Sequence, residues 1–209
     1  MNRGKFIVVE GGEGSGKGTQ LALLRKELGD QNIVWTREPG GTRIGEKIRE
    51  ILLNVESTDI KAKTELLLFY TSRAQHMEEL IIPALLSGKH VVSDRFSLST
   101  IAYQIYGRER MEYLELCKML DKNVVGDFAP DMTFLFDIDP ALGLERVKKG
   151  RSEKYDRLDA ESLQFHTRLR AGYLKEIVEI PHKIIKADRT VEEIYSDFSQ
   201  AVKLCIPPL

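Results

Sequence analysis

The sequence predicts an α/β protein with a five-stranded parallel sheet flanked by helices. Short apolar runs alternate with longer helical patterns along the chain, and this alternation is typical of parallel sheets. Some of the runs are almost continuously apolar, as in "KFIVVE" (5–10), which indicates strands covered on both faces. A length of 209 residues suits one domain over 1–209 and is sufficient for a buried core.

Five runs have the length and composition of strands, and helical periodicity fills the intervals between them. The expected strands are residues 5–10, 32–36, 90–94, 133–139 and 182–187, and the expected helices are roughly 17–29, 43–53, 60–86, 99–124, 140–149, 159–179 and 190–204. Right-handed crossovers join such strands, so their carboxyl ends lie along one edge of the sheet. Ligands bind at that edge in open α/β sheets, and we expect the functional residues there.

The charge balance and the apolar runs limit the partners of this chain. A total of 31 basic and 32 acidic side chains gives a formal net charge of −1, so neither nucleic acid nor an anionic membrane is expected as a partner. No apolar run approaches the ~20 residues that a membrane helix needs. Cys117 and Cys205 are far apart and lack metal-ligand spacing, as expected of reduced thiols. We therefore expect a cytoplasmic protein.

The segment "GGEGSGKGTQ" (11–20) has the form of a phosphate-binding loop between an expected strand and an expected helix. Backbone N–H groups and the helix dipole hold the nucleotide phosphates in such loops, and the lysine, here Lys17, follows the phosphoryl group as it moves. Gly18 stands where the motif usually has a hydroxyl. The alternative is a glycine-rich turn without a ligand. The predicted nucleotide-binding residues are Gly11, Gly12, Glu13, Gly14, Ser15, Gly16, Lys17, Gly18 and Thr19.

A second candidate element is the end of the expected strand 90–94, where Asp94 is followed by Arg95. An aspartate at the tip of a buried strand can hold Mg²⁺ through water, although it can also simply cap the next helix. The arginine directly after it favours a second phosphate group in the site. We therefore predict that Asp94 lies near Mg²⁺ and that Arg95 binds a phosphate.

Arginines gather in the loops that are expected at this edge of the sheet. They are Arg37, Arg43 and Arg49 after the second strand, Arg73 within a helix, Arg95, and Arg151 and Arg157, with Lys154, in a polar segment. Arginine forks suit phosphate oxygens, and arginines that arrive with a closing segment neutralise charge during phosphoryl transfer. Any one of them can be a solvated surface residue, and we expect that of Arg43. As a group they favour a phosphotransferase with two phosphate-bearing substrates and a lid at about 148–158.

Taken in order, the motifs of this chain resemble those of the thymidylate kinases (dTMP kinases) over nearly its whole length. The likeness rests on "EGGEGSGKGTQ", "TREPGGT", "ELLLFYTSRAQH", "VVSDRFSLSTIAYQ", "PDMTFLFDIDP" and "DRLDAESLQFHTRLRAGYL". The segments "REPGGT" and "SRAQH" followed by "DRF…AYQ" are quite specific to that family, whereas the phosphate loop alone is not. The resemblance implies the P-loop nucleoside-monophosphate kinase fold. It also implies transfer of the ATP γ-phosphate to dTMP, giving dTDP and ADP for DNA precursor synthesis.

The resemblance implies residues that hold the phosphate and the sugar of the acceptor. Arg37 and Arg95 would bind the acceptor phosphate, and Arg49 would line the same pocket. Glu13 would receive the 3′-hydroxyl of the sugar. Tyr103 would crowd the 2′ position, so the site would prefer a deoxyribose. From the residues alone, Tyr103 could equally be a helix residue that packs on the sheet.

The resemblance also implies residues that read the base. Phe69 would stack on thymine, Arg73 would hydrogen-bond its O4, and Thr100 with Gln104 would reach the remaining base edge. A flat aromatic face with a few polar groups is how a pocket reads one base, and stacking contributes ~1–3 kcal/mol. The residues alone leave alternatives open, because Phe69 could be a core residue and Gln104 a surface residue.

Catalysis in this family requires Mg²⁺ and cationic side chains. Asp94, Glu38 and Thr19 would lie near the metal and the phosphates. Some members of the family place an arginine in the phosphate loop at the position of Gly14, and in the others the lid supplies it. The predicted catalytic residues are therefore Lys17, Arg95, Arg151 and Arg157, with Lys154 as a helper.

The implied co-substrate is ATP, the implied metal is Mg²⁺ and the implied assembly is a homodimer formed through helices. The loop near Arg189 is a candidate for the adenine contact. Two alternatives remain open at this point. "GKGTQ" also resembles adenylate kinase, so the acceptor could be another nucleoside monophosphate such as AMP. A non-catalytic ATP-binding regulatory protein would have the same phosphate loop without acceptor-dependent turnover.

Overall fold

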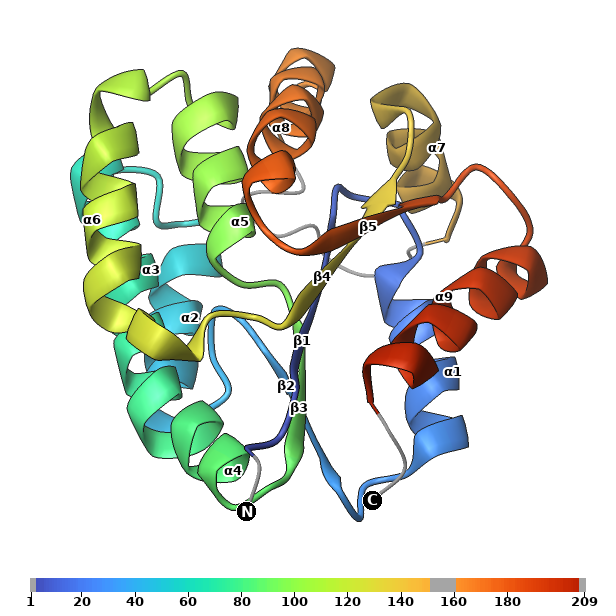
Figure 1. Ribbon diagram of the computed structural model, residues 1–209. Coiled ribbons are helices and arrows are strands. Elements are labelled where there is room, and N and C mark those ends of the chain that lie inside the picture. Colours follow the sequence, from blue (N-terminus) through green and yellow to red (C-terminus); the bar gives the residue numbers. More distant parts are fainter. Residues whose placement is uncertain (1–2, 151–160, 207–209) are drawn as a thin grey trace.

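A parallel five-stranded sheet forms the centre of the computed structural model, which describes residues 3–150 and 161–206 (Figure 1). The strand order is β2-β3-β1-β4-β5. The strands are β1 (Phe6–Gly11), β2 (Ile33–Arg37), β3 (His90–Asp94), β4 (Met132–Asp137) and β5 (His182–Lys186). The predicted α/β class is therefore confirmed, and each strand lies where the apolar runs predict it.

Helices cover both faces of the sheet, with α1 and α9 packed together on one face and α2 to α6 on the other (Figure 1). The helices are α1 (Lys17–Leu28), α2 (Arg43–Leu53), α3 (Ala62–His76), α4 (Ile82–Leu86), α5 (Ser97–Thr100), α6 (Leu114–Val124), α7 (Pro140–Gly150), α8 (Leu163–Glu176) and α9 (Val191–Cys205). Side-chain caps define several of their starts. Thr190 and Glu193 form a reciprocal capping box at α9, for example.

Two long helices that the sequence predicts are interrupted in the structure. The expected helix 99–124 is wrong as a single element, because a π-helical segment, Ile101–Gly107, follows α5 and the chain then leaves the helical path before α6. Glu109 has φ 56°, a left-handed conformation that a continuous helix does not allow. The expected helix 60–86 contains a π-helical turn, Met77–Ile81, just before Pro83, which has no N–H to donate to the preceding turn.

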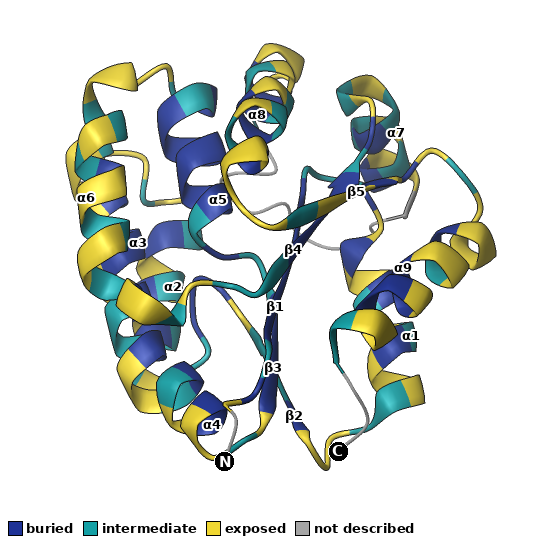
Figure 2. Cartoon of the chain, in the orientation of Figure 1, coloured by how far each residue is buried: buried dark blue, intermediate teal, exposed yellow. Residues whose placement is uncertain are grey.

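The core explains the unbroken apolar runs of the central strands. Ile7 and Val9 of β1 pack in the cluster formed with α1 and α9, whereas Phe6 and Val8 pack in the cluster that includes α4. All four side chains are almost completely buried, and the central strands are dark in Figure 2. Successive residues of a strand point to opposite faces, so a strand covered on both faces needs an apolar side chain at every position.

The remaining global expectations concern membranes and disulfides. Over residues 3–150 and 161–206, no helix is long and apolar enough to cross a membrane. Cys117 is buried, Cys205 is partly buried, and both are free thiols, as the sequence predicts.

Pairing between β1 and β3 brings the two phosphate-binding motifs together. The register places Val9 opposite Asp94, so the phosphate loop after β1 and the residues after β3 leave the sheet side by side. The backbone N–H of Arg95 donates to the Val9 carbonyl at 2.8 Å and extends the pairing by one residue. The carboxyl edge of the sheet is therefore where the candidate site is assembled.

The phosphate loop is held against the start of α7 by a contact that only glycine allows. A Cβ on Gly143 would lie 2.3 Å from the carbonyl oxygen of Glu13. We expect Gly143→Ala to lower the free energy of unfolding by about 1–3 kcal/mol, because backbone must move to make room. Gly18→Ala is the matched control, since Gly18 lies inside α1 and a Cβ there meets nothing within 4 Å.

Chemical denaturation of the two alanine variants measures both effects. The Gly18→Ala variant should be as stable as the unmodified protein or more stable by up to about 1 kcal/mol, because alanine is the better helix former. Equal stability of the Gly143→Ala variant would contradict the close contact between α7 and the loop.

Candidate active site

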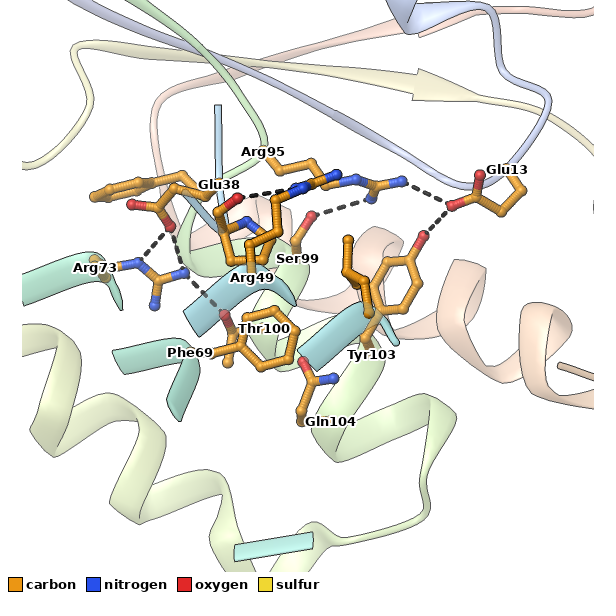
Figure 3. A pocket seen from close by; sticks show the side chains of 13 residues that line it. Glu13, Glu38, Arg49, Phe69, Arg73, Arg95, Ser99, Thr100, Tyr103 and Gln104 are labelled. Carbon is orange, nitrogen blue, oxygen red and sulfur yellow. Dashed lines mark hydrogen bonds and ion pairs between the residues drawn. The ribbon is translucent and has the colours of Figure 1, made fainter. Parts of the chain in front are cut away.

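A cavity of about 490 Å³ at the carboxyl edge brings together the predicted acceptor residues (Figure 3). Its lining residues are Glu13, Glu38, Pro39, Arg49, Leu53, Phe69, Arg73, Arg95, Phe96, Ser99, Thr100, Tyr103 and Gln104. We call this the acceptor cavity. Arg37 is not among these residues; it is exposed, and its guanidinium pairs with Glu46 at 2.8 Å.

One wall of the acceptor cavity carries polar groups that the described residues leave without hydrogen-bond partners. Gln104 is 3% exposed, and neither its amide nitrogen nor its amide oxygen has a hydrogen-bond partner in the described chain. Phe69 lies on the same cavity and presents an aromatic ring. Buried amides are normally paired, so an unpaired one facing a cavity indicates a place for a polar ligand group.

The guanidinium of Arg73 is fixed in the same wall although it is 1% exposed. It donates to the Glu38 carboxylate at 2.9 Å and to the Thr100 hydroxyl at 2.8 Å. Burial disfavours its charge, but Glu38 and then Asp121 outweigh burial and raise the pKa of Arg73. Its Nη1 makes no hydrogen bond to a described residue and lies 3.7 Å from the Asp121 carboxylate. Glu38 and Thr100 therefore hold the guanidinium in place, and its Nη1 remains as a donor.

Glu38 belongs to this wall and not to the phosphate loop. Its Oε2 accepts from Arg73, and its Oε1 lies 3.1 Å from Nδ1 of His76. The other ring nitrogen of His76 is 2.7 Å from the Thr36 hydroxyl. Glu38 lines the acceptor cavity and not the cavity over the phosphate loop, and its role near the metal stays a prediction. His76 orients the carboxylate that holds the arginine.

Arg95 lies at the boundary of the acceptor cavity. Its Nη2 donates to Glu13 at 2.8 Å, and the Tyr103 hydroxyl donates to the same carboxylate oxygen at 2.7 Å. The aromatic ring of Tyr103 lies 5.0 Å from the guanidinium carbon, within cation–π distance. Figure 3 shows this chain of three side chains along the rim of the cavity. A carboxylate, a phenol and a cation here suit a substrate that carries both hydroxyl and phosphate groups.

A second, open cavity of about 1600 Å³ lies over the phosphate loop. Its lining residues are Glu13, Gly14, Ser15, Gly16, Lys17, Gly18, Thr19, Gln20, Arg49, Asp94, Arg95, Arg146, Val147, Arg189, Thr190, Val191 and Ile194. We call this the phosphate cavity. Glu13, Arg49 and Arg95 line both cavities, so the two spaces share a boundary made of one carboxylate and two guanidinium groups.

Lys17 stands in the phosphate cavity with its ammonium group folded onto the loop. Its Nζ donates to the carbonyl oxygens of Gly11 at 2.7 Å and Gly12 at 3.3 Å. Burial, and then the positive charge of Arg95, lowers the pKa of Lys17 to about 8. An anion bound in the cavity would stabilise the charged form of this lysine.

The residues predicted at the metal are only partly brought together. Asp94 and Thr19 line the phosphate cavity, and the buried Oδ1 of Asp94 has no hydrogen-bond partner among the described residues. Over the part of the chain that the structure describes, no group of three or more His, Cys, Asp or Glu side chains could hold a metal ion. One carboxylate at the phosphates fits Mg²⁺, which typically binds through one or two carboxylates, substrate phosphates and water.

The predicted lid falls outside the described residues for most of its length. Its first residues, 148–150, end α7, whereas Arg151, Lys154 and Arg157 lie in the undescribed range 151–160. Their role is an inference from the sequence alone.

Sequence reasoning missed several residues of the site. Ser99 lines the acceptor cavity, and Glu10 and Tyr173 lie directly behind it, hydrogen-bonded to each other and to Ser99. A signal was present for Glu10, because a charged residue at the end of a buried apolar strand needs buried partners. Tyr173 lies in the segment "DRLDAESLQFHTRLRAGYL", but nothing in that segment marked it as a site residue, and it approaches the site from α8, far along the chain.

A phosphate loop after β1, an aspartate at the tip of β3 and a second ligand cavity beside them define a P-loop kinase. The family model for thymidylate kinase matches residues 9–198. Similar proteins include the thymidylate kinases of Carboxydothermus hydrogenoformans, 46% identical over 92% of this chain and 94% of the relative, and Clostridium novyi, 39% identical over 97% and 100%. The crystal structure of thymidylate kinase from Ehrlichia chaffeensis matches with a TM-score of 0.75 at 30% identity, covering 96% of this chain and 99% of that one. The chain therefore belongs to the thymidylate kinase family.

Replacing Lys17 with methionine tests its place in the phosphate cavity. The pKa is about 8 in the folded protein and 10.5 in the absence of the fold, so the buried charge opposes folding fully below pH 8. That cost fades as the pH rises from 8 to 10.5. At pH 7 we expect the ligand-free Lys17→Met variant to be at least as stable as the unmodified protein. ATP should raise the Tm of the unmodified protein alone.

Thermal unfolding at pH 7 and pH 9.5, with and without ATP, measures these effects. Any stability advantage of the variant should shrink at the higher pH, because the unmodified lysine is then largely neutral in the fold. A ligand-free variant that loses more than about 2 kcal/mol at pH 7 would show that the bonds of Lys17 to the loop carbonyls dominate its role.

Proposed function

We propose that this protein transfers the γ-phosphate of ATP to dTMP, giving dTDP and ADP, and so serves DNA precursor synthesis. The observation that carries the proposal is the shared boundary of the two cavities. Arg95, Glu13 and Arg49 separate a phosphate cavity from an acceptor cavity whose wall has an aromatic ring and polar groups without a hydrogen-bond partner among the described residues. Two nucleotides bound there would have their phosphates on either side of one set of charges.

The acceptor cavity is proposed to read a thymine base. Phe69 would stack on the ring, while Gln104 and Arg73 would pair with polar groups at its edge. A site built to hydrogen-bond a substrate rejects analogues that lack the matching groups, because its buried polar groups would then remain unpaired. Tyr103 would restrict the space at the 2′ position of the sugar, and Glu13 would receive the 3′-hydroxyl.

Catalysis would depend on position and charge more than on proton transfer. The attacking oxygen of the acceptor phosphate is already anionic, so no strong general base is required. Lys17 and Arg95 would neutralise charge on the phosphates at the cavity boundary. Arg151 and Arg157, with Lys154 as a helper, are proposed to add charge from a lid that excludes water and so prevents hydrolysis of ATP.

Mg²⁺ is proposed to bind with ATP in the phosphate cavity. Asp94 and Thr19 are the residues that would hold it, directly or through water, together with the substrate phosphates. When bound, Mg²⁺ neutralises phosphate charge during transfer. Arg189 and Thr190 line the same cavity at the start of α9, and they are proposed to contact the adenine end of ATP. A cytoplasmic homodimer is proposed as the working form.

A panel of acceptors tests the proposed function. ADP release from ATP and Mg²⁺ is measured with dTMP, dUMP, AMP, GMP or CMP, and we expect dTMP to give the highest kcat/KM. We expect this preference because Gln104 and Arg73 are proposed to pair with the polar edge of thymine. Equal or better turnover of AMP would contradict the proposal that dTMP is the acceptor. ATP binding without acceptor-dependent ADP release would favour a non-catalytic regulatory protein.

Replacing Gln104 with leucine tests how the base is read. Leucine keeps most of the volume and removes both polar groups, so we expect kcat/KM for dTMP to fall about 10–100-fold while the Kd for ATP stays unchanged. Gln75→Leu is the matched control on α3, because the half-buried Gln75 donates to Glu79 at the surface and lines neither cavity. Equal loss in both variants, or no loss in the Gln104→Leu variant, would contradict base reading by Gln104.

A further inference from the structure

Arg95 adopts a backbone conformation that needs support from its surroundings. Its φ is 71°, in the left-handed region that non-glycine residues rarely occupy. Two hydrogen bonds hold its peptide groups, one from its N–H to Val9 and one from the Ser93 hydroxyl to its carbonyl oxygen, both 2.8 Å long. The turn directs the side chain from the end of β3 back over the phosphate loop, where it donates to the Gly11 carbonyl at 3.1 Å.

Glu10 fixes the segment that follows this turn. Its carboxylate accepts from the backbone N–H of Phe96 at 2.9 Å and of Ser99 at 3.1 Å, which are donors at the start of α5. The Ser99 hydroxyl donates to its second oxygen. Glu10 is completely buried, and burial raises its pKa. A carboxylate buried at this cost, and bonded mainly to the residues after Arg95, defines where α5 begins.

Tyr173 connects this carboxylate to the guanidinium itself. Its hydroxyl lies 3.1 Å from Glu10 and 2.7 Å from the Ser99 hydroxyl, and it accepts from Nη1 of Arg95 at 3.3 Å. The ring is 1% exposed and packs edge-on against Tyr103. The hydroxyl therefore lies where Glu10, Ser99 and Arg95 meet, at the inner side of the guanidinium, while Glu13 contacts its outer side.

We propose that Glu10 and Tyr173 are positioning residues for phosphoryl transfer, which hold the Arg95 guanidinium at the boundary of the two cavities. The inference rests on the proposed dTMP kinase function, because it assigns Arg95 to the acceptor phosphate. Neither residue lines the acceptor cavity. They act on the substrate through Arg95, by fixing its backbone turn and one face of its side chain.

Replacing Tyr173 with phenylalanine tests the proposal, because the ring stays and only the hydroxyl is lost. We expect kcat for dTMP to fall about tenfold and the Kd for dTMP to rise severalfold. The Kd for thymidine, which has no phosphate, should stay within about twofold. A merely structural role would change both affinities together, so the ratio of the two Kd values separates positioning of Arg95 from general damage to the cavity.

Tyr106→Phe is the matched control. The Tyr106 hydroxyl also bonds a carboxylate across the contact with α8, that of Glu176, but it does not contact Arg95. Its kcat and both Kd values should equal those of the unmodified protein. Glu10→Gln is the second test variant, in which the amide NH₂ cannot accept from Ser99 and Tyr173, and its loss of kcat should exceed that of Tyr173→Phe. Should Glu10→Gln fail to fold, the Tyr173→Phe measurements still decide the question.

The outcomes separate two kinds of failure. No turnover of dTMP by the unmodified protein would overturn the proposed function. Normal turnover by the unmodified protein, matched by the Tyr173→Phe variant with the same ratio of Kd values, would overturn the positioning role alone. A lower kcat with a selective loss of dTMP affinity would support it.

Discussion

The parallel pairing of β1 with β3 is the constraint on which the site depends. Gly11 ends β1 and Asp94 ends β3, so the residues after both strands are forced into contact at one edge of the sheet. Arg95 continues this pairing by one hydrogen bond, to Val9, before its backbone turns into the left-handed region. The strands themselves are stabilised by burial on both faces, which fixes the points at which the two loops leave the sheet.

Buried charge is the second feature that shapes the molecule. A hydrogen-bonded chain runs from the half-buried Thr36 through the buried His76 and Glu38 to Arg73 in the wall of the acceptor cavity. An isolated charge at such depth would be strongly unfavourable, but each member here is paired with the next. Since the chain leaves Nη1 of Arg73 without a hydrogen bond to a described residue, the same network that compensates the buried charge also presents a donor in a fixed direction.

The sequence predicts the sheet well because apolar runs and turn residues are local signals, and it predicts the phosphate loop because its glycines must be contiguous. The interrupted helices were not predictable in this way. The π-helical segment that carries Tyr103 and Gln104 is set by packing against α8, a contact between distant parts of the chain. The ion pair of Arg37 with Glu46 at the surface was likewise not predictable from the motif that contains Arg37. Tyr173 reaches Arg95 only through the tertiary fold.

The pair of Glu13 and Arg95 gives the ligand-free site a defined state before any substrate binds. A guanidinium is always charged, and this one is only partly exposed, so a nearby anion stabilises it. Glu13 supplies that anion at 2.8 Å in the structure. Under the proposed function, an arriving phosphate, with higher charge and more acceptor oxygens, would compete for the same donors and release the carboxylate toward the sugar. Under the same proposal, the exchange would replace one anion by another around a guanidinium that Gly11, Ser99 and Tyr173 hold on its inner side, so little reorganisation of charge would remain for the transfer step.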